Sequence, residues 1–229
     1  MNQATKPPAH LKSRYYILVE GNIAVGKSTF INRLEEKLGP NATVFNEPVD
    51  KWTNLRGNNL LKEMYHDPSR NSFAIQSYIQ LTMAMTQQSM IYKPIRVMER
   101  SLNSGRKVFT EAMMIQGHIS RTEYNILDEW YQWLDQRNIP TNQIVYLRST
   151  PDLALKRLRE RNRPEEASVS LDYLTLIHEL HENWLIHRKP RNLPPVKIID
   201  QNQTLEETLR AADQLAIELK SKIFPHFLY

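Results

Sequence analysis

A segment near the amino terminus combines glycines, a lysine and two hydroxyl side chains at a spacing that suits phosphate binding. Residues 21–29 read GNIAVGKST and match the pattern G-x-x-x-x-G-K-[ST]. Backbone N–H groups of such a loop surround phosphate oxygens, and the amino end of the following helix adds positive charge. We expect Lys27 to reach the transferred phosphoryl group and the Ser28 hydroxyl to hold Mg²⁺. The segment predicts a nucleoside triphosphate site. Its residues are Gly21, Asn22, Ile23, Ala24, Val25, Gly26, Lys27, Ser28 and Thr29.

Two acids follow short apolar runs and are candidates for catalysis. Glu47 lies in the segment NEPVDKW, and Glu99 precedes Arg100 in the segment MERS. Parallel sheets place ligands at the carboxyl ends of their strands. Glu47 is therefore a candidate base for an acceptor hydroxyl. Glu99 resembles a metal-binding Walker B carboxylate, and Arg100 beside it can pair with charge on phosphate or substrate. Taken singly, each acid also fits an ordinary solvated surface position.

A cationic segment lies further along the chain. Five of the eight residues 156–163 are Lys or Arg, and a Pro-Glu-Glu turn follows them. One interpretation is a solvated helix face. We favour an arginine-rich lid over the triphosphate, because guanidinium groups neutralise the charge that spreads over the phosphates during transfer. Arg161 and Arg163 are the candidates for this contact.

Short apolar runs alternate with helical patterns and indicate how these residues are positioned. The expected strands are Tyr15–Val19, Thr43–Phe45, Ile95–Met98, Ile144–Leu147 and Val196–Ile199. The expected helices are Phe30–Leu38, Ser72–Gln88, Arg121–Arg137, Pro151–Arg161, Leu171–His187 and Leu205–Lys220. This alternation predicts an α/β fold, a three-layer sandwich in which helices cover both faces of a parallel sheet. We expect residues 1–14 to form a disordered tail and residues 15–229 to form a single domain.

Composition excludes several classes of protein. The 229 residues include no cysteine, so disulfides, zinc–thiolate sites, iron–sulfur clusters and a cysteine nucleophile are excluded. No run approaches the length of apolar sequence that crosses a membrane. The net charge of +5 fits either a polyanionic partner or many phosphate-binding residues. The guanine-binding N-K-x-D signature of GTPases is missing. A small-molecule kinase remains.

Several motifs together resemble one family, the animal deoxynucleoside kinases. They are EGNIAVGKST (20–29), NEPVDKW (46–52), LLKEMYHDP (60–68), IQSYIQLTM (75–83), MERS (98–101), RERNRPEE (159–166) and IHELHENWLI (177–186). The sequence is most similar to the branch with the multisubstrate deoxynucleoside kinases and the mitochondrial thymidine kinases. The resemblance runs from about Tyr16 to Asp200. It implies a five-stranded parallel sheet of the P-loop NTPase type, a homodimer, and transfer of the γ-phosphoryl group of ATP to a deoxynucleoside 5′-hydroxyl.

The resemblance also implies a role for each matching residue. Glu47 is the general base, Arg100 holds Glu47 and the reacting group, and Ser28 and Glu99 serve Mg²⁺. Arg161 and Arg163 close on the phosphates. The substrate-binding set adds Gln76 at the base edge, Phe109 and Trp52 beside the ring, Tyr65 and Glu166 at the sugar 3′-hydroxyl, and Met64.

Two uncharged positions predict which base is accepted. Relatives that prefer purines or deoxycytidine carry an Arg and an Asp where this chain has Met83 and Gly105. The chain therefore resembles the branch that accepts pyrimidines, thymidine included. Near relatives have Ala where Gly105 stands, and some have Phe where Ile75 stands. We expect both changes to enlarge the pocket and to admit purine deoxynucleosides more easily.

Other interpretations stay open at this stage. A thymidylate-type monophosphate kinase shares the loop and the lid, but it needs no base at Glu47. A nucleic-acid-binding protein would suit the basic charge, for which His187 to Arg191 offer a second cationic patch. His178, His181 and His187 suggest a metal site, although H-E-L-H is one residue short of the zinc spacing. We expect dTTP to inhibit, no specific nucleic acid or membrane partner, and a cytoplasmic location, with mitochondrion or nucleus as alternatives.

Overall fold

The computed structural model describes residues 14–187, 190 and 192–224. The predicted tail, apart from Arg14, lies outside the described residues, and so do three members of the second cationic patch, namely 188, 189 and 191.

Five parallel strands form one sheet in the order β2-β3-β1-β4-β5. The strands are β1 (Tyr15–Gly21), β2 (Ala42–Phe45), β3 (Ile95–Glu99), β4 (Gln143–Arg148) and β5 (Val196–Asp200). Because all of them run the same way, their carboxyl ends share one edge of the sheet. The loops that follow β1, β2 and β3 therefore meet there, which brings together the phosphate-binding loop, Glu47 and Arg100.

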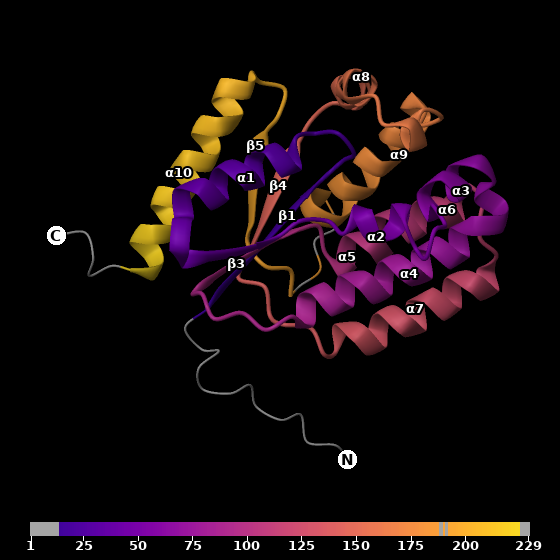
Figure 1. Cartoon of the computed structure of the whole chain (residues 1–229), viewed down its shortest axis with the longest axis horizontal. Helices are drawn as coiled ribbons and strands as arrows, with labels where there is room; N and C mark the ends of the chain where they lie inside the picture. Colours follow the sequence, from indigo (N-terminus) through magenta and orange to yellow (C-terminus); the bar gives the residue numbers. More distant parts are fainter. Residues whose placement is uncertain (1–13, 188–189, 191, 225–229) are drawn as a thin grey trace, which may run out of the picture.

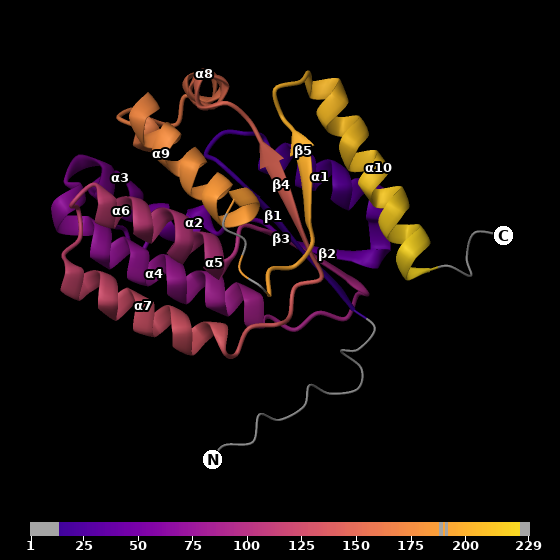
Figure 2. The ribbon, with the colours of Figure 1, turned by 180° about the vertical axis from the view of Figure 1, so that it is seen from behind.

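Helices cover both faces of this sheet, so the fold is the expected three-layer α/β sandwich (Figures 1 and 2). On one face lie α1 (Lys27–Leu38) and α10 (Leu205–Ile223), and on the other lie α4 (Pro68–Gln88), α7 (Arg121–Asp135) and α9 (Leu171–Glu182). The shorter elements are η2 (Gly39–Asn41), α2 (Val49–Thr53), α3 (Leu60–His66), α5 (Leu102–Ser104), η3 (Gly105–Thr110), α6 (Glu111–Ile115), α8 (Pro151–Arg161), η4 (Pro164–Glu166) and η5 (Asn183–His187).

The buried centre of the sheet explains the apolar runs. Ile17 and Val19 of β1 and Val145 of β4 are fully buried, as expected for central strands that are covered on both faces. Phe30 and Leu34 of α1 pack onto the same core, at the spacing of one helix face. The central strand is therefore held rigidly, and the phosphate-binding loop begins where it ends.

All five predicted strands and all six predicted helices are confirmed within a few residues. The helix from residue 171 was expected to reach His187, but α-helical geometry ends at Glu182 and the wider π-helix η5 continues it. The helices α2, α3, α5, η3 and α6 were not predicted. Helices α2 and α3 are too short to show a helical repeat in the sequence, whereas α5, η3 and α6 form one continuous helix whose middle part, η3, has π-helical rather than α-helical geometry. They line the site described next. No helix among the described residues is long and apolar enough to span a membrane.

Candidate active site

The phosphate-binding loop connects β1 to α1 and depends on two glycines. A Cβ at Gly21 would lie 2.6 Å from the Leu147 carbonyl oxygen on the neighbouring strand, so no larger residue fits there. Gly26 has a φ of 93°, a backbone conformation that glycine adopts without strain. Ala24 also has a positive φ, 60°, and its strain is typical of a functional loop. These positions turn the chain back over the amino end of α1.

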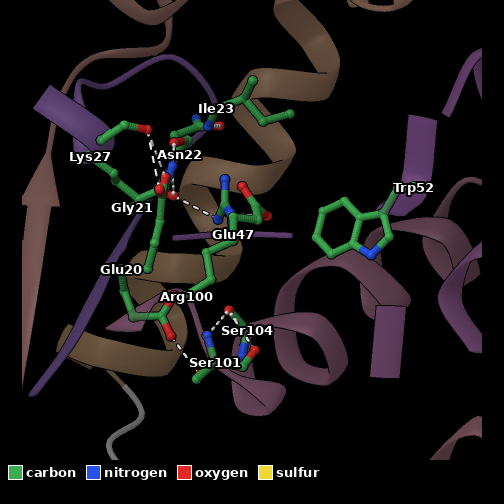
Figure 3. Close-up of polar contacts among 12 residues, drawn as sticks. Glu20, Gly21, Asn22, Ile23, Lys27, Glu47, Trp52, Arg100, Ser101 and Ser104 are labelled. Atoms are coloured by element: carbon green, nitrogen blue, oxygen red, sulfur yellow. Dashed lines mark hydrogen bonds and ion pairs between the residues drawn. The ribbon is translucent and has the colours of Figure 1, made fainter. Parts of the chain in front are cut away.

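Lys27 lies inside this loop rather than in solvent. Its Nζ donates to the Asn22 carbonyl oxygen at 2.7 Å and contacts the Gly21 carbonyl oxygen at 3.4 Å (Figure 3). Burial, together with the nearby positive charge of Arg100, lowers the pKa of Lys27 from 10.5 to about 8. A buried ammonium group with this pKa gains from an anion placed beside it, as phosphate oxygens would be.

Asn22 has a supporting role in the same loop. Its Nδ2 donates to the Leu174 carbonyl oxygen of α9 at 2.8 Å, and its Oδ1 accepts from the Ile23 N–H at 2.8 Å. The side chain of Asn22 thus ties the loop to the helix layer. Among the predicted loop residues, Ile23 and Ala24 line one cavity, and Val25, Gly26 and Thr29 line a second one.

The structure brings together Ser28 and Glu99, the two residues expected to hold Mg²⁺. The Ser28 hydroxyl lies 3.2 and 3.3 Å from the two carboxylate oxygens of Glu99, at the adjoining ends of α1 and β3. Hydroxyl and carboxylate oxygens are the ligands that Mg²⁺ prefers, and it keeps several further positions for water and phosphate. The residues present therefore fit Mg²⁺ that arrives with a triphosphate.

Arg100 connects the phosphate-binding loop to Glu47. It follows β3 with a φ of 62°, a rare conformation for arginine that directs its side chain back across the strand ends. Its Nη1 donates to the Gly21 carbonyl oxygen at 2.9 Å, and its Nε lies 2.8 Å from Glu47 Oε1 (Figure 3). The guanidinium group also lies over the Phe109 ring, 4.6 Å from the ring centroid. Because Arg100 is almost fully buried, the Glu47 carboxylate is fixed in one position.

Glu20 is a buried acid that sequence reasoning missed. It has no solvent exposure, and its Oε1 accepts a 2.5 Å hydrogen bond from the Ser101 hydroxyl (Figure 3). Burial raises the pKa of Glu20 to about 7, although the hydrogen bond from Ser101 opposes the rise. Glu20 thus links the end of β1 to the residue after Arg100. The sequence carries one signal for it, because Glu20 directly follows the apolar run of the predicted first strand.

A first cavity extends from the phosphate-binding loop past Glu47 and on between short helices. Trp52 from α2 lines it, and its Nε1 donates to the Thr82 hydroxyl of α4 at 2.9 Å, which fixes the indole ring. The side chains brought together here come from five segments that are distant in the sequence. Predicted substrate-binding residues in the lining are Glu47, Trp52, Met64, Tyr65, Gln76, Met83, Arg100, Gly105, Phe109 and Glu166.

The lining is charged near the phosphate-binding loop and mainly apolar at the other end, where Ile79, Met83 and Phe109 lie around Gln76. Gln76, which a helix surface would ordinarily expose, is 2% exposed and faces the cavity. Burial raises the pKa of Tyr65 well above its usual value, so its hydroxyl keeps its proton as a donor. A cavity of this kind suits a flat ring with one polar edge. Ile75 is not among the lining residues and packs in the core, so of the two positions expected to enlarge the pocket only Gly105 contributes.

The arginines of the cationic segment make two kinds of contact. Arg161 and Arg163 line both cavities, and their guanidinium groups lie 2.5 and 3.8 Å from the Glu166 carboxylate. Arg159 instead donates to the carbonyl oxygens of Ala167 and Val169, which holds the chain after η4. Only part of the segment therefore faces the cavities.

A second cavity lies on the outer side of the phosphate-binding loop, between α8 and the start of α10. Arg157, Gln201, Leu205 and Thr208 line it and were not predicted. Gln201 is 1% exposed, and its Nε2 has no hydrogen-bond partner among the described residues. The tertiary structure alone brings these residues to the loop. Six residues line both cavities, namely Ala24, Lys27, Ser28, Glu99, Arg161 and Arg163.

His181, one of the three histidines considered as metal ligands, is a packed core residue. His181 is fully buried, stacks on Tyr146 with ring centroids 5.9 Å apart, and contacts the Ile177 carbonyl oxygen through Nδ1 at 2.7 Å. Burial lowers the pKa of His181 to about 3, so it is neutral. Across the described part of the chain, no group of three or more His, Cys, Asp or Glu side chains is arranged to hold a metal ion.

Comparisons with known proteins agree with this geometry. Residues 17–224 match the family model described as deoxynucleoside kinase. The chain is similar to thymidine kinase 2, mitochondrial, from Homo sapiens, with 40% identity over 86% of this chain and 75% of the relative. It is 34% identical to deoxycytidine kinase 2 from Gallus gallus, over 94% of each chain. It is also 34% identical to deoxycytidine kinase from Homo sapiens, over 75% of each.

Proposed function

The chain belongs to the deoxynucleoside kinase family, and on that premise we propose that it transfers the γ-phosphoryl group of ATP to the 5′-hydroxyl of thymidine and deoxycytidine, the preferred substrates. One observation carries the proposal. A single cavity runs from Gln76 and Phe109, past Glu47, to Lys27 and Ser28 of the phosphate-binding loop. A nucleoside whose base contacts Gln76 thus has its 5′ end directed towards the triphosphate.

In the proposed reaction Glu47 accepts the proton of the 5′-hydroxyl. The oxygen then bonds to the γ-phosphorus as the bond to the β,γ-bridging oxygen breaks, and ADP leaves. The ion pair between Arg100 and Glu47, at 2.8 Å, holds the carboxylate where the hydroxyl arrives. Lys27, Arg161 and Arg163 line the same cavity and neutralise the charge on the phosphates.

Ser28 and Glu99 would hold Mg²⁺ in this scheme, since their oxygens lie 3.2–3.3 Å apart at the loop. When bound with ATP, the cation supplies charge neutralisation on the phosphate oxygens. Tyr65 and Glu166 line the cavity and bind the sugar 3′-hydroxyl. Arg161 and Arg163, which pair with Glu166, connect sugar binding to closure of the lid and so help to exclude water.

Base preference follows from the uncharged end of the cavity. Gln76 pairs with the base edge, while Phe109 and Trp52 flank the ring, and Met83 and Gly105 place no charge beside it. A pocket without charge favours pyrimidines over bases that need an ionic partner. Gly105 lines the cavity without a side chain, and a Cβ there would approach nothing closer than Ile79 at 3.9 Å, so the volume of one methyl group is left for a larger base.

The experiment that tests the proposal compares thymidine, deoxycytidine, deoxyadenosine, deoxyguanosine and dTMP as acceptors with ATP and Mg²⁺. We expect kcat/KM to be highest for thymidine and deoxycytidine, lower for the purine deoxynucleosides, and undetectable for dTMP. A preference for dTMP would remove the role of Glu47 and would indicate a monophosphate kinase instead.

A homodimer is part of the proposal. Helices α4 and α7 lie side by side on the outside of the molecule (Figure 2) and expose large apolar side chains. These are Leu81, Met85, Ile126, Trp130 and Trp133, each more than 40% exposed. A second copy of the chain would cover them. Trp130→Glu should then convert the dimer to a monomer in sedimentation, whereas Ile217→Glu on the exposed side of α10 should not.

We also propose inhibition by dTTP. Because six residues of the loop, β3 and the lid line both cavities, one molecule can occupy the nucleoside position and the phosphate position together. Inhibition should therefore be competitive with thymidine and with ATP in steady-state kinetics.

We place the protein in the cytoplasm, although one relative is named mitochondrial, and localisation of the full chain distinguishes these compartments.

A further inference from the structure

A buried hydroxyl lies next to the glutamine that we propose reads the base. Thr110 ends the π-helix η3 and has no solvent exposure. Its Oγ1 lies 3.0 Å from the Gly105 carbonyl oxygen and 3.5 Å from Gln76 Oε1. Within the part of the chain that the structure describes, Thr110 is the residue to which the Gln76 amide hydrogen-bonds. Thr110 does not line the cavity, so it acts on the base only through Gln76.

The hydroxyl can satisfy either end of the Gln76 amide. It carries one hydrogen and two lone pairs. When it donates to Gln76 Oε1, the amide nitrogen lies on the other side. When it donates to the Gly105 carbonyl oxygen, it offers a lone pair to Gln76, and Nε2 can turn towards it. The structure shows the orientation with Oε1 towards Thr110, at 3.5 Å, and the same hydroxyl has a lone pair for the orientation that is turned by half a turn.

The two pyrimidines require opposite amide orientations. The edge of thymine presents an N–H donor beside the O4 acceptor, whereas cytosine presents a ring-nitrogen acceptor beside its amino donor. An amide that forms two hydrogen bonds with one of these edges must turn over to form two with the other. Acceptance of both bases thus depends on the free-energy difference between the two orientations of Gln76.

We propose that Thr110 determines the breadth of pyrimidine acceptance, because its hydroxyl lets Gln76 present either order of donor and acceptor to the base. The inference rests on the proposed function, in which Gln76 pairs with the base edge. Thr110 is a positioning residue, since it contacts Gln76 and not the substrate.

Thr110→Val tests this role because it keeps the shape of the side chain and removes the hydroxyl. In Thr110→Val, a Gln76 amide with Nε2 towards the valine would have a buried N–H without an acceptor. With Oε1 towards the valine, the amide oxygen would lose only one of its two possible hydrogen bonds. Unpaired buried N–H groups are rarer than underused carbonyl oxygens. Valine should therefore hold Gln76 with Oε1 towards residue 110, and one pyrimidine should lose its match. Thr110→Ser keeps the hydroxyl and is the matched control.

The experiment measures kcat/KM for thymidine and for deoxycytidine with the wild type, Thr110→Val and Thr110→Ser. Dissociation constants of both nucleosides are measured by calorimetry without ATP. We expect the ratio between the two nucleosides to change by about fivefold or more in Thr110→Val, in both measurements, and to stay within about twofold in Thr110→Ser. Thr110→Ala, which also lacks the hydroxyl, replaces the valine variant if that protein does not fold.

A ratio that stays within twofold in the variants without the hydroxyl would overturn the inference, and so would an equal change in Thr110→Ser. Uniform loss for both nucleosides would mean that Thr110 only supports packing, which also overturns it. Failure of the proposed function looks different: the wild type would phosphorylate neither nucleoside. The calorimetric ratio then still decides whether Thr110 governs recognition of the base.

Discussion

The two ends of the first cavity are built in different ways. At the phosphate end, the loop after β1 and the end of β3 bring Lys27, Ser28, Glu99 and Arg100 together, and all except Ser28 are almost fully buried. At the base end, uncharged side chains arrive from several short helices and from α4. The phosphate end is rigid and charged, because it grows directly from the central strands of the sheet. The base end is apolar and is held by packing between helices.

This difference predicts which substitutions should change the rate of phosphoryl transfer and which should change the preference among acceptor nucleosides. A change at the phosphate end should affect every acceptor equally, since the triphosphate is the same in each reaction. A change at the base end should alter the ratio between acceptors, since only the base differs there. Four measurements probe the two ends of the cavity, and they are described in decreasing order of the effect that we expect.

Glu47→Ala should have the largest effect. Without a carboxylate to accept the proton of the 5′-hydroxyl, kcat should fall by about 10²–10⁴-fold for all acceptors, while thymidine still binds. Steady-state kinetics and calorimetry measure the two quantities. Asp50→Ala, at an exposed carboxylate in the helix that follows Glu47, is the matched control and should leave kcat unchanged. Turnover within a few-fold of the wild type in Glu47→Ala would show that Glu47 is not the base.

Glu20→Gln should change how stability depends on pH. Since the folded protein raises the pKa of Glu20 from 4.5 to about 7, this group stabilises the fold fully below pH 4.5, and that contribution is lost as the pH rises through 7. The rise corresponds to about 3 kcal/mol. Glutamine has no proton to lose, so relative to wild type the variant should gain stability between pH 5 and 8 in denaturant titrations.

Glu36→Gln is the control for that measurement, because the Glu36 side chain is 63% exposed and remote from the loop. It should follow the wild-type pH dependence. If the difference between Glu20→Gln and wild type were the same at every pH, the pKa of Glu20 would be the same in the folded and the unfolded protein, and burial would not raise it.

Lys27 gives the phosphate end its own dependence on pH. Because burial lowers its pKa to about 8, the free protein loses the ammonium charge above that pH, and ATP must then bind together with a proton. The dissociation constant of ATP should rise above pH 8, towards about tenfold for each pH unit. Binding of deoxycytidine, which depends on the base end, should change little. Nucleotide affinity that is constant from pH 7 to 9.5 would contradict the assignment.

Gly105→Ala should have the smallest effect and should change only the preference among acceptor nucleosides. The added methyl group meets Ile79 at 3.9 Å, an ordinary contact, so the fold accommodates it and the cavity loses volume. We expect kcat/KM for deoxyadenosine to fall by about fivefold to tenfold relative to thymidine, as pockets discriminate by single methyl groups. An unchanged ratio would show that Gly105 does not set the width of the pocket.

The structure brings together the residues that the sequence placed at the phosphate end. The glycine pattern, Lys27 and Ser28 are consecutive, and the apolar runs before Glu47 and Glu99 place both acids at strand ends. Parallel strands leave their carboxyl ends at one edge, so proximity follows from the order of the elements. Glu20 was missed although an acid beside an apolar strand run was a signal for it, and its raised pKa depends on complete burial, which only the tertiary structure shows.

At the base end, residue types and spacing alone gave little indication of which side chains line the cavity. Gln76, Phe109 and Trp52 have the types of ordinary helix and core residues, and only the family resemblance marked them. The short helices α3 and η3 gave no periodic signal, and the contact between Thr110 and Gln76 joins positions that are 34 residues apart. The second cavity likewise joins Gln201 to a loop near the other end of the chain.

The sheet, the phosphate-binding loop and the acids at its edge follow from the amino-acid sequence, because each depends on periodicity or on spacing within a short segment. The packing of side chains around the base end, the position of Glu47 beside Arg100 and the raised pKa of Glu20 appear only in the folded molecule. These depend on burial and on contacts between distant segments. Such contacts exist only after the helices have packed onto the sheet.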